Sequence, residues 1–401
     1  MLNLLDKDIL NFALENGIID ISTIREQIEM SKREEYLKMH PYKIWQGTNG
    51  KWYTYLQDKE GRRIQKNRTT QKDIEDLIVS TIRESIDSPT VKDIYYDWMD
   101  DRLEREEIEK ATYSRYERVF NRCFSEIKNK EIKKIDEMDI ENFLKNAIHK
   151  NNLSQKAYSN MRTIVYGIFR YAKKRKLIDY SIKQTIGDIQ FSRKEFKQVV
   201  HEDNEQVFMV SEEEKIIDYL ENNKDLINLG LLLLFKTGLR IGELSVLEKS
   251  DIGLNRISIN KTETIYKENG KFVYDIKDCP KTEAGVRSVI VPNNCVWILQ
   301  EIRRKCPFGD FVFMEHGERV KSHRFRNRLR HICKKIGITS KSPHKIRKTY
   351  GSKLYDSKDV TEAFIITQMG HTDISCLKKH YYYNRMEVDE QTEMLNKAAI
   401  F

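Results

Sequence analysis

Three consecutive tyrosines near the end of the chain are the first residues whose setting could support chemistry. Residues 370–383 read GHTDISCLKKHYYY, so that Tyr381 follows His371 by ten residues. A run of aromatic residues in a buried strand would be ordinary, because aromatic side chains favour strands and pack well. Here two lysines and a histidine precede the run, and an Asn-Arg pair follows it. A phenol in such a polar and basic setting can act as a reactive group.

An arginine between two apolar segments is a second candidate. In LLLLFKTGLRIGELSVLEKSDI, Arg240 separates a buried helix from a new helix whose apolar face is Ile241, Leu244 and Leu247, and Glu243 lies near it. An arginine at a helix entrance is often only a capping or ion-pairing residue. Arg240 taken alone therefore does not identify a site.

The spacing His-x-x-Arg occurs three times, at His316 with Arg319, His323 with Arg326, and His344 with Arg347. Spacing alone cannot choose among the three pairs. Context favours the third, because SPHKIRKTYGSKL begins with Ser-Pro, a typical helix start. His344 and Arg347 would then lie one turn apart on one face of the new helix.

Six residues in chain order resemble the catalytic boxes of the tyrosine recombinases, also called the phage integrase family: Arg240, Lys281, His344, Arg347, His371 and Tyr381. The resemblance lies in the box TGLRIGEL, in the hairpin lysine of CPKTEAGVRSVIVP, in HKIR, and in MGHTDIS followed by tyrosine. It covers the chain from about residue 207 to the end. It implies neither a metal ion nor a cofactor, and the sequence has no GxxxxGK loop and no convincing acidic metal cluster.

The chemistry that this resemblance implies is the exchange of DNA strands. A tyrosine that attacks a phosphodiester replaces one oxygen ester with another, so the bond energy is kept in a 3′-phosphotyrosyl intermediate. Arg240 and Arg347 would bind the non-bridging oxygens with their planar forks. His344 is the candidate base for the phenolic proton. By the family pattern, Lys281 would protonate the leaving 5′ oxygen, and His371 would complete the phosphate pocket.

The run of tyrosines leaves the nucleophile to be chosen. Family members place it nine or ten residues after the histidine of the Gly-His pair. Nine residues after His371 is His380, which cannot serve, and ten residues after it is Tyr381. Tyr382 and Tyr383 remain alternatives, because more than one phenol is within reach.

The elements that must position these residues are mostly helices. From about residue 208, helical patterns surround one strand-rich segment, RISINKTETIYKENGKFVYDIKDCPKTEAGVRSVIVP, whose turns at Gly270 and 281–285 predict a small antiparallel sheet. Between Thr90 and about Asp179, apolar residues recur at three- and four-residue spacing, which predicts a compact helical domain. We therefore expect a multidomain, mainly α protein with small antiparallel β-sheets.

The N-terminal part has a different pattern. YKIWQGTNGKWYTYLQDKEGRRIQKN, from Tyr42, predicts a three-stranded antiparallel meander, followed by a helix that Thr69 or Thr70 caps and that ends near Ser85. Four basic residues gather on the last strand and its exit: Arg62, Arg63, Lys66 and Arg68. Either a DNA-binding strand or a solvated edge strand would account for them.

These patterns divide the chain into four stretches. Residues 1–88 resemble the arm-type DNA-binding domain of conjugative-transposon and some phage integrases, and residues 89–190 resemble the core-binding domain of the family. Residues 191–206 lack periodicity and are interpreted as a linker. Residues 207–401 resemble the catalytic domain of the family, followed by a C-terminal tail.

Composition is consistent with a polyanionic partner. Lys+Arg number 71 and Asp+Glu 62 in 401 residues, which gives a formal net charge of +9. Six cysteines without a CxxC pair indicate neither a zinc site nor a disulfide framework, which fits a reducing cytoplasm. The first residues lack the pattern of a signal peptide, and no apolar run is long enough for a membrane span.

We expect an integrase-type site-specific recombinase that moves a mobile element or a prophage. The resemblance implies double-stranded DNA with core-type and arm-type sites, a homotetramer on DNA, and a tail that docks on a neighbouring catalytic domain. An excisionase and a host DNA-bending protein are further expected partners. Two alternatives stay open: a non-catalytic DNA-binding regulator on the same scaffold, and a type IB topoisomerase-like relaxation of DNA.

Overall fold

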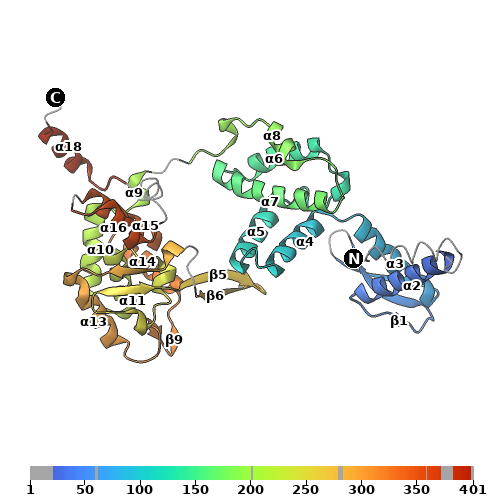
Figure 1. Cartoon of the computed structure of the whole chain (residues 1–401), viewed down its shortest axis with the longest axis horizontal. Coiled ribbons are helices and arrows are strands. Elements are labelled where there is room, and N and C mark those ends of the chain that lie inside the picture. Colours follow the sequence, from blue (N-terminus) through green and yellow to red (C-terminus); the bar gives the residue numbers. More distant parts are fainter. Residues whose placement is uncertain are drawn as a thin grey trace, which may run out of the picture. The chain divides into compact units, whose positions relative to one another are not determined.

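The computed structural model describes residues 21–58, 62–199, 202–278, 283–357, 359–371 and 383–398. The chain divides into two compact units, Met1–Gln198 and Val199–Phe401. Helices dominate both units, and the strands pair in small antiparallel sheets (Figure 1). The predicted fold class, mainly α with small antiparallel β-sheets, is confirmed.

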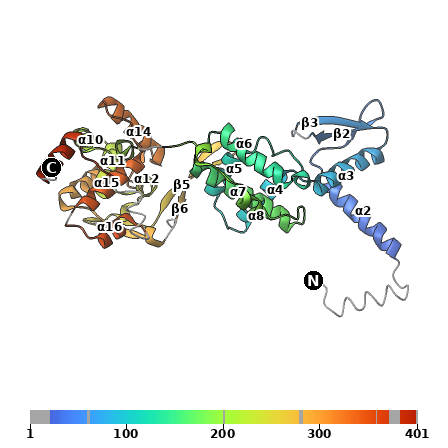
Figure 2. The ribbon, with the colours of Figure 1, turned by 90° about the horizontal axis from the view of Figure 1, so that it is seen from above.

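The described part of the first unit starts with a helix and a three-stranded sheet. Helix α2 (Ile21–Met39) precedes strands β1 (Trp45–Gln46), β2 (Trp52–Gln57) and β3 (Arg63–Arg68), which pair in the order β1-β2-β3. Helix α3 (Gln71–Asp87) lies against the sheet (Figure 2), and the Thr70 side chain accepts a hydrogen bond from the backbone N–H of Asp73 at 3.1 Å. The meander and its capped helix are confirmed, whereas α2 was not expected.

The rest of the first unit is helical. Its elements are α4 (Val91–Glu104), α5 (Lys110–Cys123), η1 (Ile132–Lys134), α6 (Glu137–Lys150), α7 (Gln155–Lys174), α8 (Ile182–Asp188) and η2 (Arg193–Glu195). The apolar positions that predicted α7 face the core of this helical part. Helix α4 approaches α7 closely at Gly167, where an added Cβ would lie 2.1 Å from the Trp98 ring. Phe196, within the predicted linker, also packs into this core.

The second unit is built around one buried helix. Its helices are α9 (Asp203–Gln206), α10 (Val210–Asn222), α11 (Leu226–Thr237), α12 (Ile241–Leu244), η3 (Lys249–Asp251), η4 (Glu283–Gly285), η5 (Asn293–Cys295), α13 (Val296–Lys305), α14 (Ser322–Lys335), α15 (Pro343–Asp356), α16 (Glu362–Met369) and α18 (Val388–Lys397). Almost every residue of α11 is buried, and α10, α13, α14 and α15 pack around it. This central helix leads directly into Arg240, so the core fixes the position of that residue.

The strands described in the second unit form three separate pairs. Strand β4 (Arg256–Ile259) pairs with β7 (Arg287–Ile290), β5 (Thr262–Glu268) with β6 (Lys271–Lys277), and β8 (Met314–Glu315) with β9 (Glu318–Arg319). The single small sheet predicted for residues 256–292 is therefore two pairs. Asn269 and Gly270, with φ of 50° and 80°, make a tight turn that joins β5 to β6 as a protruding ribbon (Figure 1). Strands β4 and β7 pair across that insertion.

Residues after the tyrosine run return to the surface of the same unit. The Arg385 guanidinium donates to the Phe208 carbonyl at 3.2 Å and bonds the buried Glu213 carboxylate, and the Arg385 carbonyl accepts from the Val210 N–H at 3.2 Å. The Ser211 hydroxyl donates to Glu387 at 2.8 Å. Helix α18, which follows, has no buried residue. Arg385 and Glu387 are thus anchored to this unit, and α18 beyond them is exposed.

Four cysteines lie in the described part of the chain, and each is a buried free thiol: Cys123, Cys295, Cys306 and Cys333. Burial raises the pKa of the Cys333 and Cys295 thiols above the ordinary value. No helix among the described residues has the length and apolarity that crossing a bilayer requires.

Candidate active site

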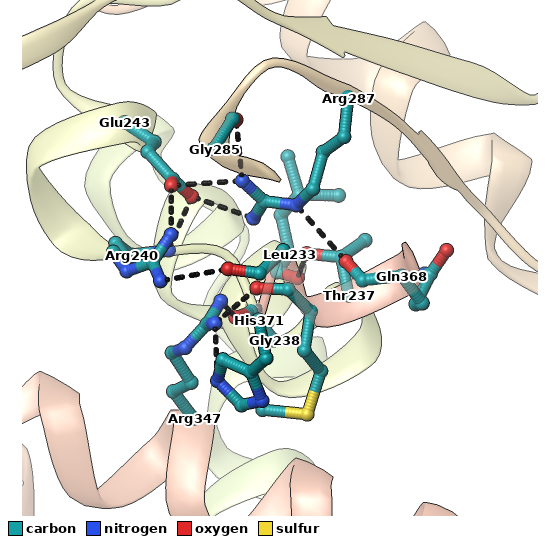
Figure 3. A network of polar contacts seen from close by, with 12 residues as sticks. Leu233, Thr237, Gly238, Arg240, Glu243, Gly285, Arg287, Arg347, Gln368 and His371 are labelled. Carbon is teal, nitrogen blue, oxygen red and sulfur yellow. Dashed lines mark hydrogen bonds and ion pairs between the residues drawn. The ribbon is translucent and has the colours of Figure 1, made fainter. Parts of the chain in front are cut away.

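Arg240 stands at the junction of two helices. Helix α11 ends at Gly238, which adopts the left-handed conformation (φ 66°) that favours glycine, and Arg240 is the N-cap of α12. Its guanidinium donates to Glu243 Oε1 at 2.8 Å, and its backbone N–H donates to Glu243 Oε2 at 2.8 Å. It also donates to the Gly370 carbonyl at 3.2 Å (Figure 3). The Arg240 side chain remains 39% exposed, so a ligand can reach the guanidinium.

Glu243 is the buried carboxylate at the base of this arrangement. Its side chain is 1% exposed and forms ion pairs with both Arg240 and Arg287. Burial opposes ionisation, but the hydrogen bonds from Arg287 and the charges of Arg287, Arg347 and Arg240 outweigh that effect and lower the pKa of Glu243 to about 2. The carboxylate is therefore ionised at neutral pH and orients the two guanidinium groups that it contacts.

Arg347 approaches the same point from α15. Ser342 and Pro343 begin this helix as the sequence predicts, with Pro343 in the first turn. The Arg347 guanidinium is fully buried, donates to the Gly238 carbonyl at 2.8 Å and bonds the Met369 carbonyl. Its Nη2 lies 3.1 Å from His371 Nε2 (Figure 3). Arg347 thus joins the end of α11 to the end of α16.

His371 is positioned by the end of α16. Gly370 terminates that helix in the left-handed conformation (φ 62°), and the His371 N–H donates to the Ile366 carbonyl at 3.1 Å. Glycine is required for space as well, because an added Cβ at residue 370 would lie 2.7 Å from the Ala284 carbonyl. The buried His371 ring is brought beside Arg347 by this turn.

His344 lies one turn before Arg347 on α15. The protein atoms around its ring, together with the charges of Arg347, Lys348, Lys345 and Arg240, lower the pKa of His344 to about 4. Part of the side chain faces solvent, which weakens the effect of the surrounding protein atoms, but the four cations all act in the same direction. The imidazole is therefore neutral at pH 7 and able to accept a proton.

The other two His-x-x-Arg pairs lie elsewhere. Arg319 binds the buried Glu263 carboxylate at 2.7 Å, and Arg326 is an exposed residue of α14. The third pair, His344 with Arg347, is the one whose arginine bonds Gly238, Met369 and His371. Arg240, Arg347 and His371 therefore meet around the end of α16.

Two of the predicted residues, Lys281 and Tyr381, lie outside the described residues, as does Tyr382. Tyr383 is described: its hydroxyl accepts a hydrogen bond from Lys348 Nζ at 2.8 Å, and its backbone N–H donates to Ser352 Oγ at 3.3 Å. Burial, with a contribution from Asp203, raises the pKa of the Tyr383 phenol. The third tyrosine is thus held on α15 in its protonated form.

The sequence analysis noted Glu243 but did not identify Arg287 as part of the site. Arg287 begins β7, at an inward-facing position of a strand whose burial alternates. Its guanidinium binds both oxygens of Glu243, at 2.8 and 2.9 Å. An arginine at an inward position of an alternating strand was the available signal, because buried arginines are nearly always paired.

The four basic residues of the N-terminal sheet do not share one surface. Arg62 pairs with Asp58 at 2.7 Å, and Arg63 lies 3.6 Å above the Tyr55 ring on the sheet face that carries Trp45 and Tyr53. Lys66 and Arg68 project from the opposite face of β3. In the strand register they lie opposite Thr54 and Trp52 of β2.

Within the described residues, no group of three or more His, Cys, Asp or Glu side chains could hold a metal ion. Arg240 and Arg347 carry positive charge at the site, with His344 and His371 near them. An arrangement of two guanidinium groups and two imidazoles is suited to binding a phosphoryl group and moving a proton near it.

Family profiles and individual relatives both match this chain to integrases and tyrosine recombinases. The sequence profile of the Phage integrase family matches residues 206–387, and that of the Phage integrase N-terminal SAM-like domain matches residues 90–148. A XerC-like tyrosine recombinase of Caldanaerobacter subterraneus is 25% identical over 391 residues, covering 88% of this chain and 95% of the relative. The ICEBs1 integrase of Bacillus subtilis is 22% identical over 67% of this chain and 71% of its own length.

Solved structures share the fold. The Tn1549 transposon integrase, in complex with transposon right end DNA, aligns with a TM-score of 0.56 and 18% identity over 77% of this chain and 100% of its own. A lambda integrase tetramer bound to a Holliday junction aligns with a TM-score of 0.53 and 16% identity over 86% of this chain and 98% of its own.

Proposed function

The chain belongs to the phage integrase family of tyrosine recombinases, and from this premise we propose that it is a site-specific DNA recombinase that integrates and excises a mobile element or prophage. Its substrate is double-stranded DNA, and its product in the first step is a 3′-phosphotyrosyl linkage. The N-terminal region is proposed to bind arm-type sites and residues 89–190 core-type sites, in the cytoplasm, as a tetramer on DNA.

One observation carries this proposal: two guanidinium groups from separate helices meet at a single turn. Arg240 donates to the Gly370 carbonyl at 3.2 Å, Arg347 bonds the neighbouring Met369 carbonyl, and His371 follows directly. Arginine forks bind phosphate oxygens with defined geometry, and fixed cations stabilise the charge that develops in a phosphoryl-transfer transition state. We propose that the scissile phosphate binds at this turn.

In the proposed chemical step, every bond that forms replaces a bond that breaks, and side chains of this chain accept and donate the protons. The phenolic oxygen of Tyr381 attacks phosphorus, the bond from phosphorus to the 5′ oxygen breaks, and the other oxygen ester is retained. The phenolic proton passes to His344, which is neutral at pH 7 because its pKa is lowered to about 4. Lys281 donates a proton to the leaving 5′ oxygen. Attack by a 5′ hydroxyl of a second strand reverses these transfers and releases the tyrosine.

Trapping of the covalent adduct tests the proposal. Nicked duplexes, tiled across the DNA that flanks this gene, would be incubated with the full chain in EDTA. We expect a covalent complex with the wild-type chain, because arginines rather than a divalent ion meet the transition-state charge. Tyr381→Phe should bind the same DNA but give no complex, whereas Tyr382→Phe and Tyr383→Phe should retain it. Peptide mapping of the adduct identifies the tyrosine.

Each alternative has a distinct outcome in this experiment. Phosphate on Tyr382 would show that the nucleophile was assigned one residue too early. Binding of DNA without an adduct on any tyrosine would favour a non-catalytic regulator. Relaxation of any supercoiled plasmid without site preference would favour a topoisomerase, and activity that EDTA abolishes and magnesium restores would contradict the tyrosine mechanism.

A further inference from the structure

We infer that Arg287 is a positioning residue for the active site, an inference that rests on the proposed recombinase function. Its side chain is 3% exposed, and the proposed reaction gives it no direct contact with DNA. Its guanidinium instead makes four hydrogen bonds inside the unit: two to Glu243, one to the Gly285 carbonyl and one to the Gln368 carbonyl (Figure 3).

The two hydrogen bonds from Arg287 to Glu243 fix the position of Arg240. Glu243 Oε1 accepts from Arg287 Nη1 at 2.9 Å and from Arg240 Nη1 at 2.8 Å, while Oε2 accepts from Arg287 Nη2 at 2.8 Å and from the Arg240 backbone at 2.8 Å. Both oxygens are therefore shared between the two arginines. Because the Arg287 fork sets the plane of the carboxylate, it also sets the direction of the Arg240 guanidinium.

The hydrogen bond from Arg287 to the Gln368 carbonyl fixes the turn that carries His371. Arg287 Nε donates to the Gln368 carbonyl at 3.1 Å, and the Gln368 side chain bonds the backbone N–H and carbonyl of Ile290, both at 2.9 Å. An added Cβ on Gly370 would lie 2.8 Å from Arg287 Cδ. Arg287 thus packs against the turn at residues 369–370, whose carbonyls accept hydrogen bonds from Arg240 and Arg347.

A further hydrogen bond joins Arg287 to the turn that precedes β7. Arg287 Nη1 donates to the Gly285 carbonyl at 3.1 Å, within the short turn η4 that precedes β7. One guanidinium therefore ties together β7, α12, the end of α16 and η4. A lysine could keep the charge of Arg287 but could not hold both oxygens of Glu243 together with two carbonyls.

The chain supplies a matched control. Arg319 forms a second ion pair with a buried glutamate, Glu263, at 2.7 Å, with side chains 9% and 1% exposed. Its other bonds go to the Ser245 and Tyr274 carbonyls, at 3.1 and 3.2 Å. The hydrogen bonds of Arg319 thus go to none of Arg240, Arg347 and His371. Arg319→Lys therefore removes a guanidinium that bonds one buried carboxylate and two backbone carbonyls, but outside the proposed site.

The test compares Arg287→Lys with Arg319→Lys in the full chain. The rate constant of adduct formation would be measured at saturating DNA, on the nicked duplex that the wild-type chain cleaves, alongside the Kd for that DNA and the thermal midpoint of each variant. We expect Arg287→Lys to react about 100-fold more slowly, the scale of loss when a catalytic group moves by about 1 Å. Its Kd should stay within about 2-fold, because exposed cations supply most of the DNA affinity. Arg319→Lys should keep the wild-type rate despite a similar loss of thermal stability.

Equal rates for the two variants, or equal losses of rate, would overturn the positioning role. If Arg287→Lys does not fold, Glu243→Asp shortens the carboxylate that Arg287 shares with Arg240, and a wild-type rate for that variant would overturn the inference equally. Absence of an adduct with the wild-type chain on every duplex would contradict the proposed function itself, and the positioning role with it.

Discussion

At the scale of single residues, His344 makes stability depend on pH. Its pKa is lowered to about 4 in the folded chain, against about 6.5 when unfolded. The unfolded state therefore binds more protons between these values, so we expect the free energy of unfolding to fall as pH decreases from about 6.5 to about 4. His344→Gln should flatten that slope in urea titrations made at a series of pH values.

The control for this experiment is His331→Gln, which changes an exposed histidine of α14. Other titrating groups contribute to all three proteins alike, so the difference between the two variants isolates His344. Identical slopes for His344→Gln and His331→Gln would show that the cations around His344 do not shift its titration.

The sequence identified the residues whose neighbours along the chain carry the signal. Arg240 is recognisable from the glycines and the glutamate around it, and His344 from the Ser-Pro helix start. For Arg287 the alternation of its strand indicates burial, but not its role, because its partners Glu243 and Gln368 are far away in sequence and meet it only after folding. Lys281 and Tyr381 stay predictions, since neither lies among the described residues.

At the scale of elements, periodicity predicted the helices well and strand pairing poorly. The buried stripe of α7 follows directly from apolar spacing. The partner of β4 could not be found in this way, because β7 lies beyond a hairpin insertion and strand registers carry little sequence signal across such a distance. Helix α2 was missed because its apolar residues form no strong stripe.

The contact between α4 and α7 gives a prediction about packing. Gly167→Ala should lower the free energy of unfolding by roughly 1–3 kcal/mol, because the new methyl group would overlap the Trp98 ring at 2.1 Å. Gly187→Ala in α8 is the matched control: nothing lies within 4 Å of its Cβ, so it should be neutral or stabilise the chain by up to about 1 kcal/mol. Urea denaturation measures both, and equal effects would contradict the close approach.

The N-terminal sheet gives a second prediction for an element. Its open face combines the aromatic rings of Trp45, Tyr53 and Tyr55 with Arg63. Removing residues 1–88 should spare covalent-complex formation on core-site DNA and abolish binding to distal arm sites, because a sheet can enter the major groove. Electrophoretic mobility shifts on long and short attachment-site DNA measure this. Equal affinity of the truncated and full chains for the long DNA would indicate a solvated edge strand.

At the scale of the whole molecule, the exposed C-terminal helix predicts an intersubunit contact. Val388, Met394 and Leu395 of α18 are 75%, 50% and 49% exposed, while Arg385 before them is anchored to its own unit. Deleting residues 394–401 should therefore weaken multimer assembly on DNA and leave the thermal midpoint of the free chain nearly unchanged. Native gels and calorimetry test this, and an aggregated or unfolded truncation would indicate docking on its own unit.

Each compact unit contains a buried thiol whose rate of chemical modification can report the opening of that unit. An alkylating reagent needs an exposed thiolate, so Cys123 in the first unit and Cys333 in the second can react only when their surroundings open. The rate at which each thiol is modified, read by mass spectrometry of its peptide, then reports the free energy of opening of that unit. Binding of DNA that stabilises only one unit would slow modification of the thiol in that unit and leave the rate for the other thiol unchanged.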